Sequence, residues 1–259
     1  MANDSSRRNE IRMTTTLAWS IKNRPDEVIK SIKSADLSAA GDTRFLLVDA
    51  ASENENLARI KYVISKIERP IKIIESYKCM SLPQAWNLAM MLCGTDKIIF
   101  ASSDVVFNKS GWNESLNNAL VAMPYVLIDN HSVFGLDIKT MTSKVGWFDE
   151  NFKSGPHFDP DYMIRASEAG IPIGIIKNFY YSHGDDDATK LERLTSDVKD
   201  RLPMNDFVNE EYFMKKWGSN WPGWKEAIAR KELHMPHPPT NITQVTRKLQ
   251  EIDFHPGYR

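Results

Sequence analysis

The sequence predicts an α/β fold with a mainly parallel sheet flanked by helices. Short apolar runs bounded by turn residues alternate with amphipathic segments of helical period over residues 13–107. Polar residues that could bind a ligand or take part in catalysis follow the carboxyl ends of these apolar runs. Of the 259 residues, 42% are hydrophobic and 26% are charged, as in an ordinary globular protein. Such alternation means parallel strands joined by right-handed crossovers, with helices on both faces.

The first strand and helix have clear boundaries. A strand rich in Thr and apolar residues is expected over Met13–Ile21. Pro25 ends this strand and suits the first turn of a helix. The helix is expected to fray before Gly41, and a second strand follows over Arg44–Val48.

Two further helices and two strands complete the alternation. Pro70–Ile74 is expected to form the third strand, Leu82–Leu92 the third helix, and the run Ile98–Phe100 the fourth strand. The second helix carries five apolar residues at helical spacing, namely Leu57, Ile60, Val63, Ile64 and Ile67. The resulting order is β-α-β-α-β-α-β.

Polar residues gather where these strands end. In parallel sheets the carboxyl ends of the strands share one edge, where ligands bind, so Asn23, Arg24, Asp49 and Asp104 are expected there. We call this edge the rim. Asp104 offers the hard anionic oxygen that Mg²⁺ or Mn²⁺ prefers. The alternative for Asp104 is a turn residue that caps the next helix.

Several functional classes lose weight on the sequence alone. No G-x-G-x-x-G follows the first strand and no G-x-x-x-x-G-K-[ST] is present, which argues against dinucleotide and P-loop sites. A net charge of −1 provides no general attraction to nucleic acid or anionic lipid.

The expected setting is the cytoplasm. Cys79 and Cys93 are the two cysteines, which is no disulfide framework and suits a reducing compartment. No apolar stretch approaches the ~20 residues that a membrane-spanning helix needs. The polar start, residues 1–12, lacks the apolar core of a signal peptide.

Seven short segments occur in a fixed order between residues 20 and 183: Ser20–Pro25, Val48–Ser52, Gln84–Ala89, Ser102–Asp104, Gly146–Phe152, Phe158–Gly170 and Tyr181–His183. They resemble, in the same order, the TYNRP, VDDGS, ARNxA, D-x-D, GGFDExF, EDxDLxxRxxxAG and late-histidine motifs of family-two-like glycosyltransferases, which use nucleotide sugars. The resemblance implies the GT-A fold of that family, which is Rossmann-like.

The resemblance implies roles for the reacting groups. Asp104 and His183 are expected to hold a divalent cation, Mn²⁺ or Mg²⁺, which neutralises the departing diphosphate. The alternative for His183 is a histidine at a strand end whose hydrogen bonds are satisfied. Asp159 is expected to be the general base that takes the proton from the acceptor hydroxyl.

The resemblance also implies the two binding sites. The residues expected to bind the donor nucleotide are Ser20, Asn23, Arg24, Asp49, Asn87, Ser102 and Ser103. The acceptor site is expected to contain Trp147, Phe148 and Asp161. Trp147 is equally well interpreted as a core residue. For Asp161, the favoured interpretation is the N-cap of a helix over Tyr162–Ala169.

Four departures from the family pattern bear on the donor site. Ser102 replaces the first Asp of D-x-D, and Ala50–Ala51 replaces the Asp-Gly of VDDGS. Trp86 removes the Arg of ARNxA, and Phe158 replaces the Glu of the ED pair. One metal carboxylate and one base are left, and the nucleotide remains open.

The expected organisation has three parts. Residues 1–12 are expected to be disordered, 13–185 to form the catalytic domain, and 186–259 a helical extension. Residues 13–107 form the nucleotide-binding half of the domain and 108–185 the acceptor half. In the extension, helices are expected over 188–201, 209–218 and 240–252, packed on the core by Trp217, Trp221 and Trp224.

The sequence therefore predicts a glycosyltransferase that moves a sugar from a nucleoside-diphosphate sugar, with UDP favoured, to an acceptor hydroxyl, with inversion and metal assistance. A glycan, a small molecule and a modified nucleic-acid base remain open as acceptors, and a homodimer is included among the partners. A nucleotidyltransferase is one alternative. It would need a loop rich in Gly and Lys or Arg after the first strand to bind a triphosphate, and Lys22–Arg24 provides few such residues. A non-catalytic module that binds sugar nucleotides or glycans is the other, favoured by Ser102 and Trp86.

Overall fold

A computed structural model describes residues 15–128, 132–153, 157–176, 181–183 and 206–218. The first half follows the predicted order, with β1 (Thr15–Ile21), α1 (Pro25–Ser38), β2 (Thr43–Ala50), α2 (Asn54–Ile64), β3 (Ile71–Ser76), α3 (Leu82–Leu92) and β4 (Lys97–Ala101). The remaining elements are β5 (Val105–Phe107), α4 (Trp112–Ala122), β6 (Tyr125–Ile128), β7 (Val133–Asp137), α5 (Ile138–Lys144), α6 (Phe158–Glu168), β8 (Ile173–Ile176), β9 (Tyr181–His183) and α8 (Asp206–Trp217).

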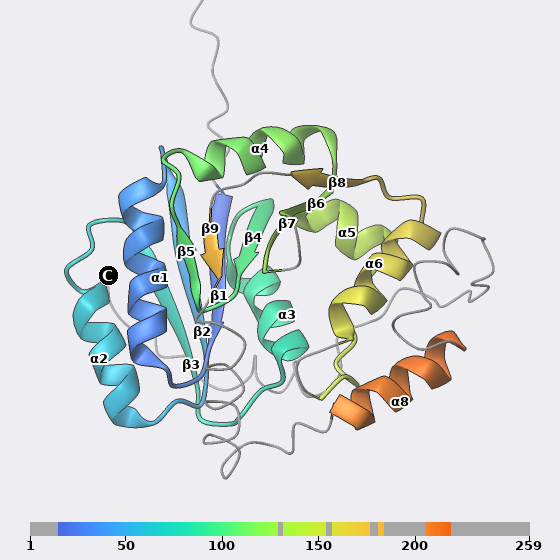
Figure 1. Cartoon of the computed structure of the whole chain (residues 1–259), viewed down its shortest axis with the longest axis horizontal. Coiled ribbons are helices and arrows are strands. Elements are labelled where there is room, and N and C mark those ends of the chain that lie inside the picture. Colours follow the sequence, from blue (N-terminus) through green and yellow to red (C-terminus); the bar gives the residue numbers. More distant parts are fainter. Residues whose placement is uncertain (1–14, 129–131, 154–156, 177–180, 184–205, 219–259) are drawn as a thin grey trace, which may run out of the picture.

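The central sheet has seven strands in the order β3-β2-β1-β4-β7-β6-β8 (Figure 1). Strands β1 to β4 pair in parallel, which confirms the predicted crossovers. The antiparallel strand β7 joins this half to β6, and β8 pairs with β6 in parallel. Strands β5 and β9 form a separate antiparallel pair. The mainly parallel α/β fold is confirmed.

Helices cover both faces of the sheet (Figure 1). One apolar cluster lies between the sheet and α1, α2 and α4, and the other lies between the sheet and α3, α5, α6 and α8. Strand β4 supplies both, because Ile98 and Phe100 belong to one cluster and Ile99 and Ala101 to the other. A strand buried on both faces reads as a continuous apolar run, which is why the sequence revealed it.

Two helices differ from expectation in informative ways. Helix α6 begins at Phe158, one turn before the expected start at Tyr162, so Asp161 is not its N-cap. The N-cap residue is His157, at a left-handed φ of 83°. The helix expected over 209–218 is α8, which begins at Asp206.

The other expected features of the termini lie outside the described residues. They are the disordered segment 1–12, the helices over 188–201 and 240–252, Trp221 and Trp224. Among the helices that the structure does describe, none combines the length and the apolar character needed to cross a bilayer.

Candidate active site

The turns after β1 and β2 form one side of the rim and bind each other directly. The backbone N–H of Asn23 donates to Ser52 Oγ at 2.7 Å, and Asn23 Oδ1 accepts from the backbone N–H of Glu53 at 2.9 Å. Asn23 and Arg24 have left-handed φ values of 54° and 55°. Such conformations are costly outside glycine and gather at functional sites. The rim turn is therefore held in place by its neighbour.

Asp49 is the penultimate residue of β2, and its carboxylate is buried. Both of its oxygens lie 3.2 Å from the backbone N–H of Ser52, which donates to them. Burial raises the pKa of Asp49, and the hydrogen bonds from Ser52 oppose that rise. Ala51, in the turn that these bonds close, has a φ of 65°. Alanine thus occupies a left-handed position that the glycine of the family motif would adopt without strain.

Asp104 lies in the turn between β4 and β5. The backbone N–H of Val105 donates to Ser102 O at 3.1 Å, and Ser102 N donates to Ser132 O at 2.8 Å. Arg24 Nη2 lies 3.9 Å from Asp104 Oδ2, so the first and fourth strand ends meet as predicted. Ser102, Ser103 and Asp104 all remain partly exposed.

The pairing of β5 with β9 brings the two predicted metal ligands to one place in the fold. Val105, the residue after Asp104, pairs with His183 in the antiparallel register (Figure 1). The segments that carry Asp104 and His183 are therefore neighbours although they are far apart in the sequence. In the part of the chain that the structure describes, no group of three His, Cys, Asp or Glu residues is arranged to hold a metal ion.

Asp159 lies in the first turn of α6 and is partly exposed. Desolvation raises its pKa to about 7, against the opposing effect of its own backbone N–H. A carboxylate whose pKa lies near neutrality accepts a proton more readily than an ordinary aspartate does. Its position and basicity suit general-base chemistry.

Asn87 of α3 holds the segment 146–152, which we call the acceptor segment. Its amide nitrogen donates to Phe148 O at 2.9 Å and to Glu150 Oε1 at 2.8 Å. Its amide oxygen accepts from Phe148 N at 2.9 Å. Asn87 is fully buried. Protein partners therefore occupy both the amide nitrogen and the amide oxygen of Asn87. The predicted contact of Asn87 with the nucleotide stays a prediction.

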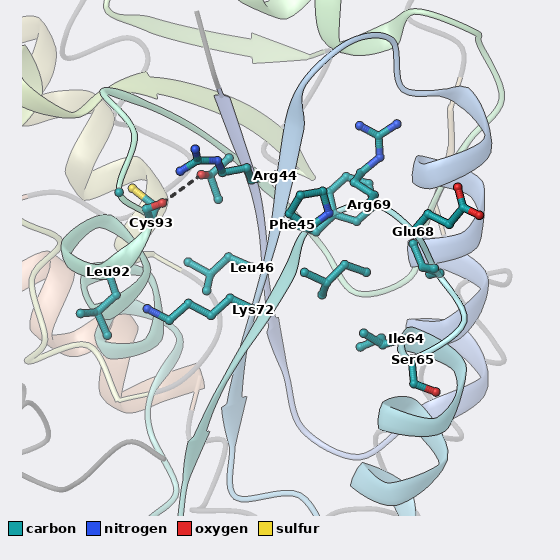
Figure 2. A pocket seen from close by; sticks show the side chains of 15 residues that line it. Arg44, Phe45, Leu46, Ile64, Ser65, Glu68, Arg69, Lys72, Leu92 and Cys93 are labelled. Atoms are coloured by element: carbon teal, nitrogen blue, oxygen red, sulfur yellow. Dashed lines mark hydrogen bonds between the residues drawn. The ribbon is translucent and has the colours of Figure 1, made fainter. Parts of the chain in front are cut away.

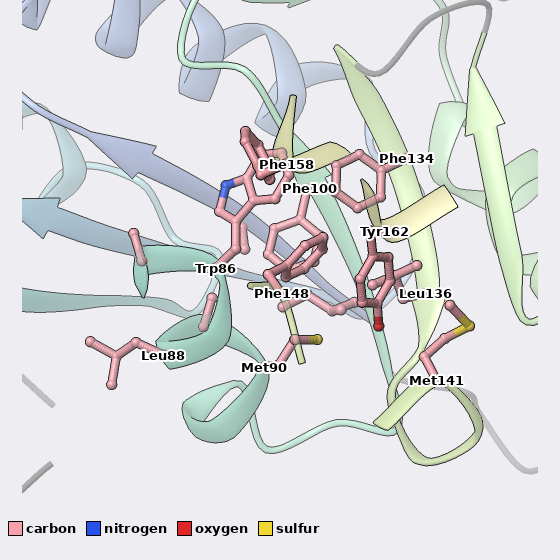
Figure 3. Close-up of a cluster of buried hydrophobic side chains, with 14 of the residues drawn as sticks. Trp86, Leu88, Met90, Phe100, Phe134, Leu136, Met141, Phe148, Phe158 and Tyr162 are labelled. Carbon is pink, nitrogen blue, oxygen red and sulfur yellow. The ribbon is translucent and has the colours of Figure 1, made fainter. Parts of the chain in front are cut away.

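The two predicted aromatic acceptor residues differ in burial. Phe148 is 1% exposed and lies 4.1 Å from the Tyr162 ring in a cluster of aromatic side chains (Figure 3). Trp147 is half-buried and packs against the edge of the same core. Of the two, only Trp147 keeps surface for a ligand.

Two departures from the family pattern meet in this cluster. The ring centroids of Trp86 and Phe158 are 4.9 Å apart, in an edge-on arrangement. Trp86 also stacks on Phe100 at 4.9 Å (Figure 3). Trp86 and Phe158, which stand where the family motifs have an Arg and a Glu, thus form an aromatic contact with each other. The two substitutions form one change, from charged groups to core packing.

Asp161 is held by side chains from two helices. Arg165 Nε and Lys216 Nζ lie 2.9 Å and 2.7 Å from its oxygens, and Trp217 Nε1 donates to it at 2.9 Å. Asp161 has no exposed surface, so the structure gives it the task of anchoring α8. The i, i+4 spacing of Asp161 and Arg165 was a readable signal, but the contribution of Lys216 was not.

A cavity of about 780 Å³ lies away from the rim (Figure 2). Its lining includes Arg44 and Lys72, near the starts of β2 and β3, and Leu92 at the end of α3. Because parallel strands start at the edge opposite to their carboxyl ends, this cavity is separate from the candidate site.

Comparison with known proteins supports the fold. No family model matches the sequence, and no curated protein matches it either. Among solved structures, the mannosyltransferase PcManGT from Pyrobaculum calidifontis, in complex with GDP-Man and Mn²⁺, is similar with a TM-score of 0.61 and 10% identity. The match covers 86% of this chain and 70% of that one.

Two further structures agree. Residues 1–349 of S. aureus TarS, in complex with UDP-GlcNAc, give a TM-score of 0.55 at 12% identity and cover 85% of this chain and 77% of that one. A longer TarS structure is covered over 42% of its length. Glucosyl-3-phosphoglycerate synthase from Mycobacterium tuberculosis, in complex with Mn²⁺, UDP and phosphoglyceric acid, gives 0.52 at 10% identity and covers 72% and 76%. This chain therefore has the GT-A fold of the glycosyltransferases that it resembles, as its motifs predict.

Proposed function

We propose that this protein transfers a sugar from a nucleoside-diphosphate sugar to an acceptor hydroxyl, with inversion at the anomeric carbon. The observation that carries the proposal is the register of β5 and β9, in which Val105 pairs with His183 beside the rim. The GT-A fold supports the same conclusion, and so do the sugar nucleotides GDP-Man and UDP-GlcNAc in the complexes of two structural neighbours.

The two proposed metal ligands suit a divalent cation. Asp104, at the rim, would offer a carboxylate, and His183, in the strand paired with β5, would offer an imidazole. A carboxylate and an imidazole, completed by diphosphate oxygens and water, are ligands that Mn²⁺ accepts. When bound, the cation offsets the negative charge that the leaving diphosphate gains. Two structural neighbours contain Mn²⁺.

Asp159 is the proposed general base. As the acceptor oxygen attacks the anomeric carbon, its proton passes to Asp159 and the new glycosidic bond forms. The bond from the anomeric carbon to the diphosphate breaks, and its electron pair leaves with the diphosphate. Attack from the face opposite to the leaving group inverts the anomeric centre. The pKa of about 7 supports this role, because the carboxylate is both available and basic near neutral pH.

The proposed donor contacts are the partly exposed rim residues, which are Ser20, Asn23, Arg24, Ser102 and Ser103, together with Asp49. Trp147 is the proposed acceptor contact, since a sugar packs its apolar face on an indole. Asn87, Phe148 and Asp161 are not included, because each is buried against another element of the acceptor side. Asp49 is kept although it is buried, because its hydrogen-bond partner, Ser52, lies in the rim turn itself.

The test begins with ligand-induced stabilisation. UDP, GDP, CDP and TDP, with their common sugar conjugates, are added with and without Mn²⁺ while the melting temperature is followed. A ligand at about one hundred times its Kd raises stability by roughly 2.7 kcal/mol. Asp104→Asn should lose the Mn²⁺-dependent part of the shift, whereas the exposed Asp96→Asn should not. If no nucleotide raises the melting temperature with Mn²⁺ present, the proposed donor class is wrong.

A further inference from the structure

A buried lysine joins three segments of the acceptor side. The side chain of Lys216, on α8, is 8% exposed. Its ammonium lies 2.6 Å from Asp149 Oδ2, in the acceptor segment, and 2.7 Å from Asp161 Oδ1, in α6. A single cation from the chain beyond residue 205 therefore binds two carboxylates of the candidate site's framework.

The groups around Lys216 balance its charge and satisfy the carboxylates. Arg165 Nε lies 2.9 Å from Asp161 Oδ2, so two cations face two anions. The Tyr212 hydroxyl donates to Asp149 Oδ2 at 2.8 Å, and Trp217 Nε1 donates to Asp161 Oδ1 at 2.9 Å. We call these six residues, Asp149, Asp161, Arg165, Tyr212, Lys216 and Trp217, the α8 clamp. Burial raises the pKa of Asp149, but Lys216 and the hydrogen bonds from the Asn151 backbone and Tyr212 together hold this pKa below its ordinary value.

The ion pairs of the clamp contribute geometry rather than burial. Phe213 and Trp217 already place apolar surface of α8 in the core, with exposures of 0% and 3%. Buried ion pairs add little net stability over apolar residues of the same size, because desolvating the charges offsets their attraction. Their hydrogen bonds nevertheless accept only one relative placement of the partners.

That placement bears on the reacting group. Asp161 lies in the same helical turn as Asp159, and Asp149 is two residues from Trp147 in the acceptor segment. Within the described residues, the contacts of Lys216 lie away from the rim: its partners are Asp149 and Asp161, with the rings of Phe152, Tyr212 and Trp217 nearby. The clamp therefore acts on the acceptor side of the site.

We propose that Lys216 is a positioning residue, which fixes the first turn of α6 against the acceptor segment and so sets the position of Asp159. The inference rests on the proposed function and extends it, because it makes α8 a working part of the transfer site. Donor binding at the rim is independent of the clamp.

The experiment compares Lys216→Met with Lys215→Met. Methionine keeps most of the length of the lysine side chain without its charge, and Lys215 is the exposed neighbour on the same helix. The nucleoside-diphosphate sugar that stabilises the wild-type chain is the probe, and release of nucleoside diphosphate measures turnover, with water as acceptor. Lys216→Met should lower kcat on the order of 10- to 100-fold, since small misplacements of a reacting group have effects of this size. Its Kd for UDP or GDP should change less than about 2-fold, and Lys215→Met should match the wild type.

A second measurement needs no turnover. In Lys216→Met, amide hydrogen exchange should accelerate in residues 158–162 and 146–152 and stay unchanged in β1 and β2. Lys216→Arg keeps the cation and should restore part of the turnover. If Lys216→Met does not fold, Tyr212→Phe carries the test, with a few-fold loss of kcat at unchanged Kd.

Three results would overturn the inference while leaving the proposed function intact. They are full turnover in Lys216→Met, equal losses of turnover and nucleotide affinity, and, if Tyr212→Phe has to be used, full turnover in that variant. A wild-type chain that binds none of the nucleoside diphosphates or their sugars would instead overturn the proposed function, and the inference with it.

Discussion

The donor side and the acceptor side of the candidate site are built by different means. On the donor side, the turns after β1, β2 and β4 meet because parallel strands end at one edge, and the contacts between them are partly exposed, as in the 3.9 Å approach of Arg24 to Asp104. On the acceptor side, buried polar groups join distant segments, as when Asn87 binds Glu150 and Lys216 binds Asp149.

This difference indicates which substitutions should change ligand affinity and which should change folding stability. Exposed rim groups are solvated in the free protein, so their loss changes ligand affinity more than folding. Buried polar partners left alone retain the full cost of desolvation, so their loss destabilises the protein. Substitutions on the donor side should therefore lower ligand affinity more than stability, and substitutions on the acceptor side should lower stability more than ligand affinity.

The largest expected effect is on turnover. Asp159→Asn removes the proposed base while keeping the shape of the side chain, and should lower kcat by about 10²- to 10⁴-fold with the donor still bound. Initial rates and nucleotide-induced melting shifts measure the two parts. Glu168→Gln, on an exposed position of the same helix, is the control. Unchanged turnover in Asp159→Asn would contradict its role as the base, whereas donor binding without any turnover by the wild type would point to a binding module.

Phe148 and Trp147 test which of the two predicted aromatic acceptor residues belongs to the core. Phe148→Ala should cost about 3–5 kcal/mol of unfolding free energy, because it opens a cavity in the core. Trp147→Ala should cost clearly less, because the side chain is half-buried, and should weaken acceptor use. Denaturant unfolding of both variants decides the matter. Equal losses of stability would make Trp147 a core residue instead.

Two asparagines compare the sides directly. Asn87→Ala should destabilise the protein by about 2–3 kcal/mol, because Glu150 and the Phe148 backbone lose buried partners. Asn23→Ala removes a part-exposed side chain and should cost about 1 kcal/mol or less while it weakens nucleotide binding. Thermal unfolding with and without nucleotide measures both, and a reversed order would break the comparison.

The pH dependence of stability should be a smaller effect than the loss of turnover. Burial raises the pKa of Asp159 from the ordinary 3.8 of an exposed aspartate to about 7, so the folded state holds an extra proton between these pH values. Stability contributed by this group is therefore lost as the pH rises from 4 to 7. Asp159→Asn should be more stable than the wild type at pH 8 and should lose that advantage near pH 4.

The same protonation should govern turnover. The base works when it is deprotonated, so kcat/KM of the wild type should rise with pH through a midpoint near 7. A flat profile between pH 5 and 8 would argue against Asp159 as the base.

The sequence by itself determined the first half of the protein. Apolar runs such as Ile98–Phe100 and turn signals such as Pro25 are local, and parallel strands then bring their ends together without further information. For that reason the rim residues Asn23, Arg24, Asp49 and Asp104 could be predicted as neighbours. The family resemblance predicted that Asp104 and His183 hold one cation, and the structure pairs Val105, the residue after Asp104, with His183.

Only the tertiary structure decided the acceptor side. Whether Phe148 and Asn87 face a ligand or the core depends on how α3 packs on the acceptor segment. Whether Asp161 caps a helix or holds Lys216 depends on a helix some fifty residues away in the sequence. Local patterns report which residues suit a strand or a turn, but the partner of a buried charge is set by long-range packing, which no short stretch of sequence contains.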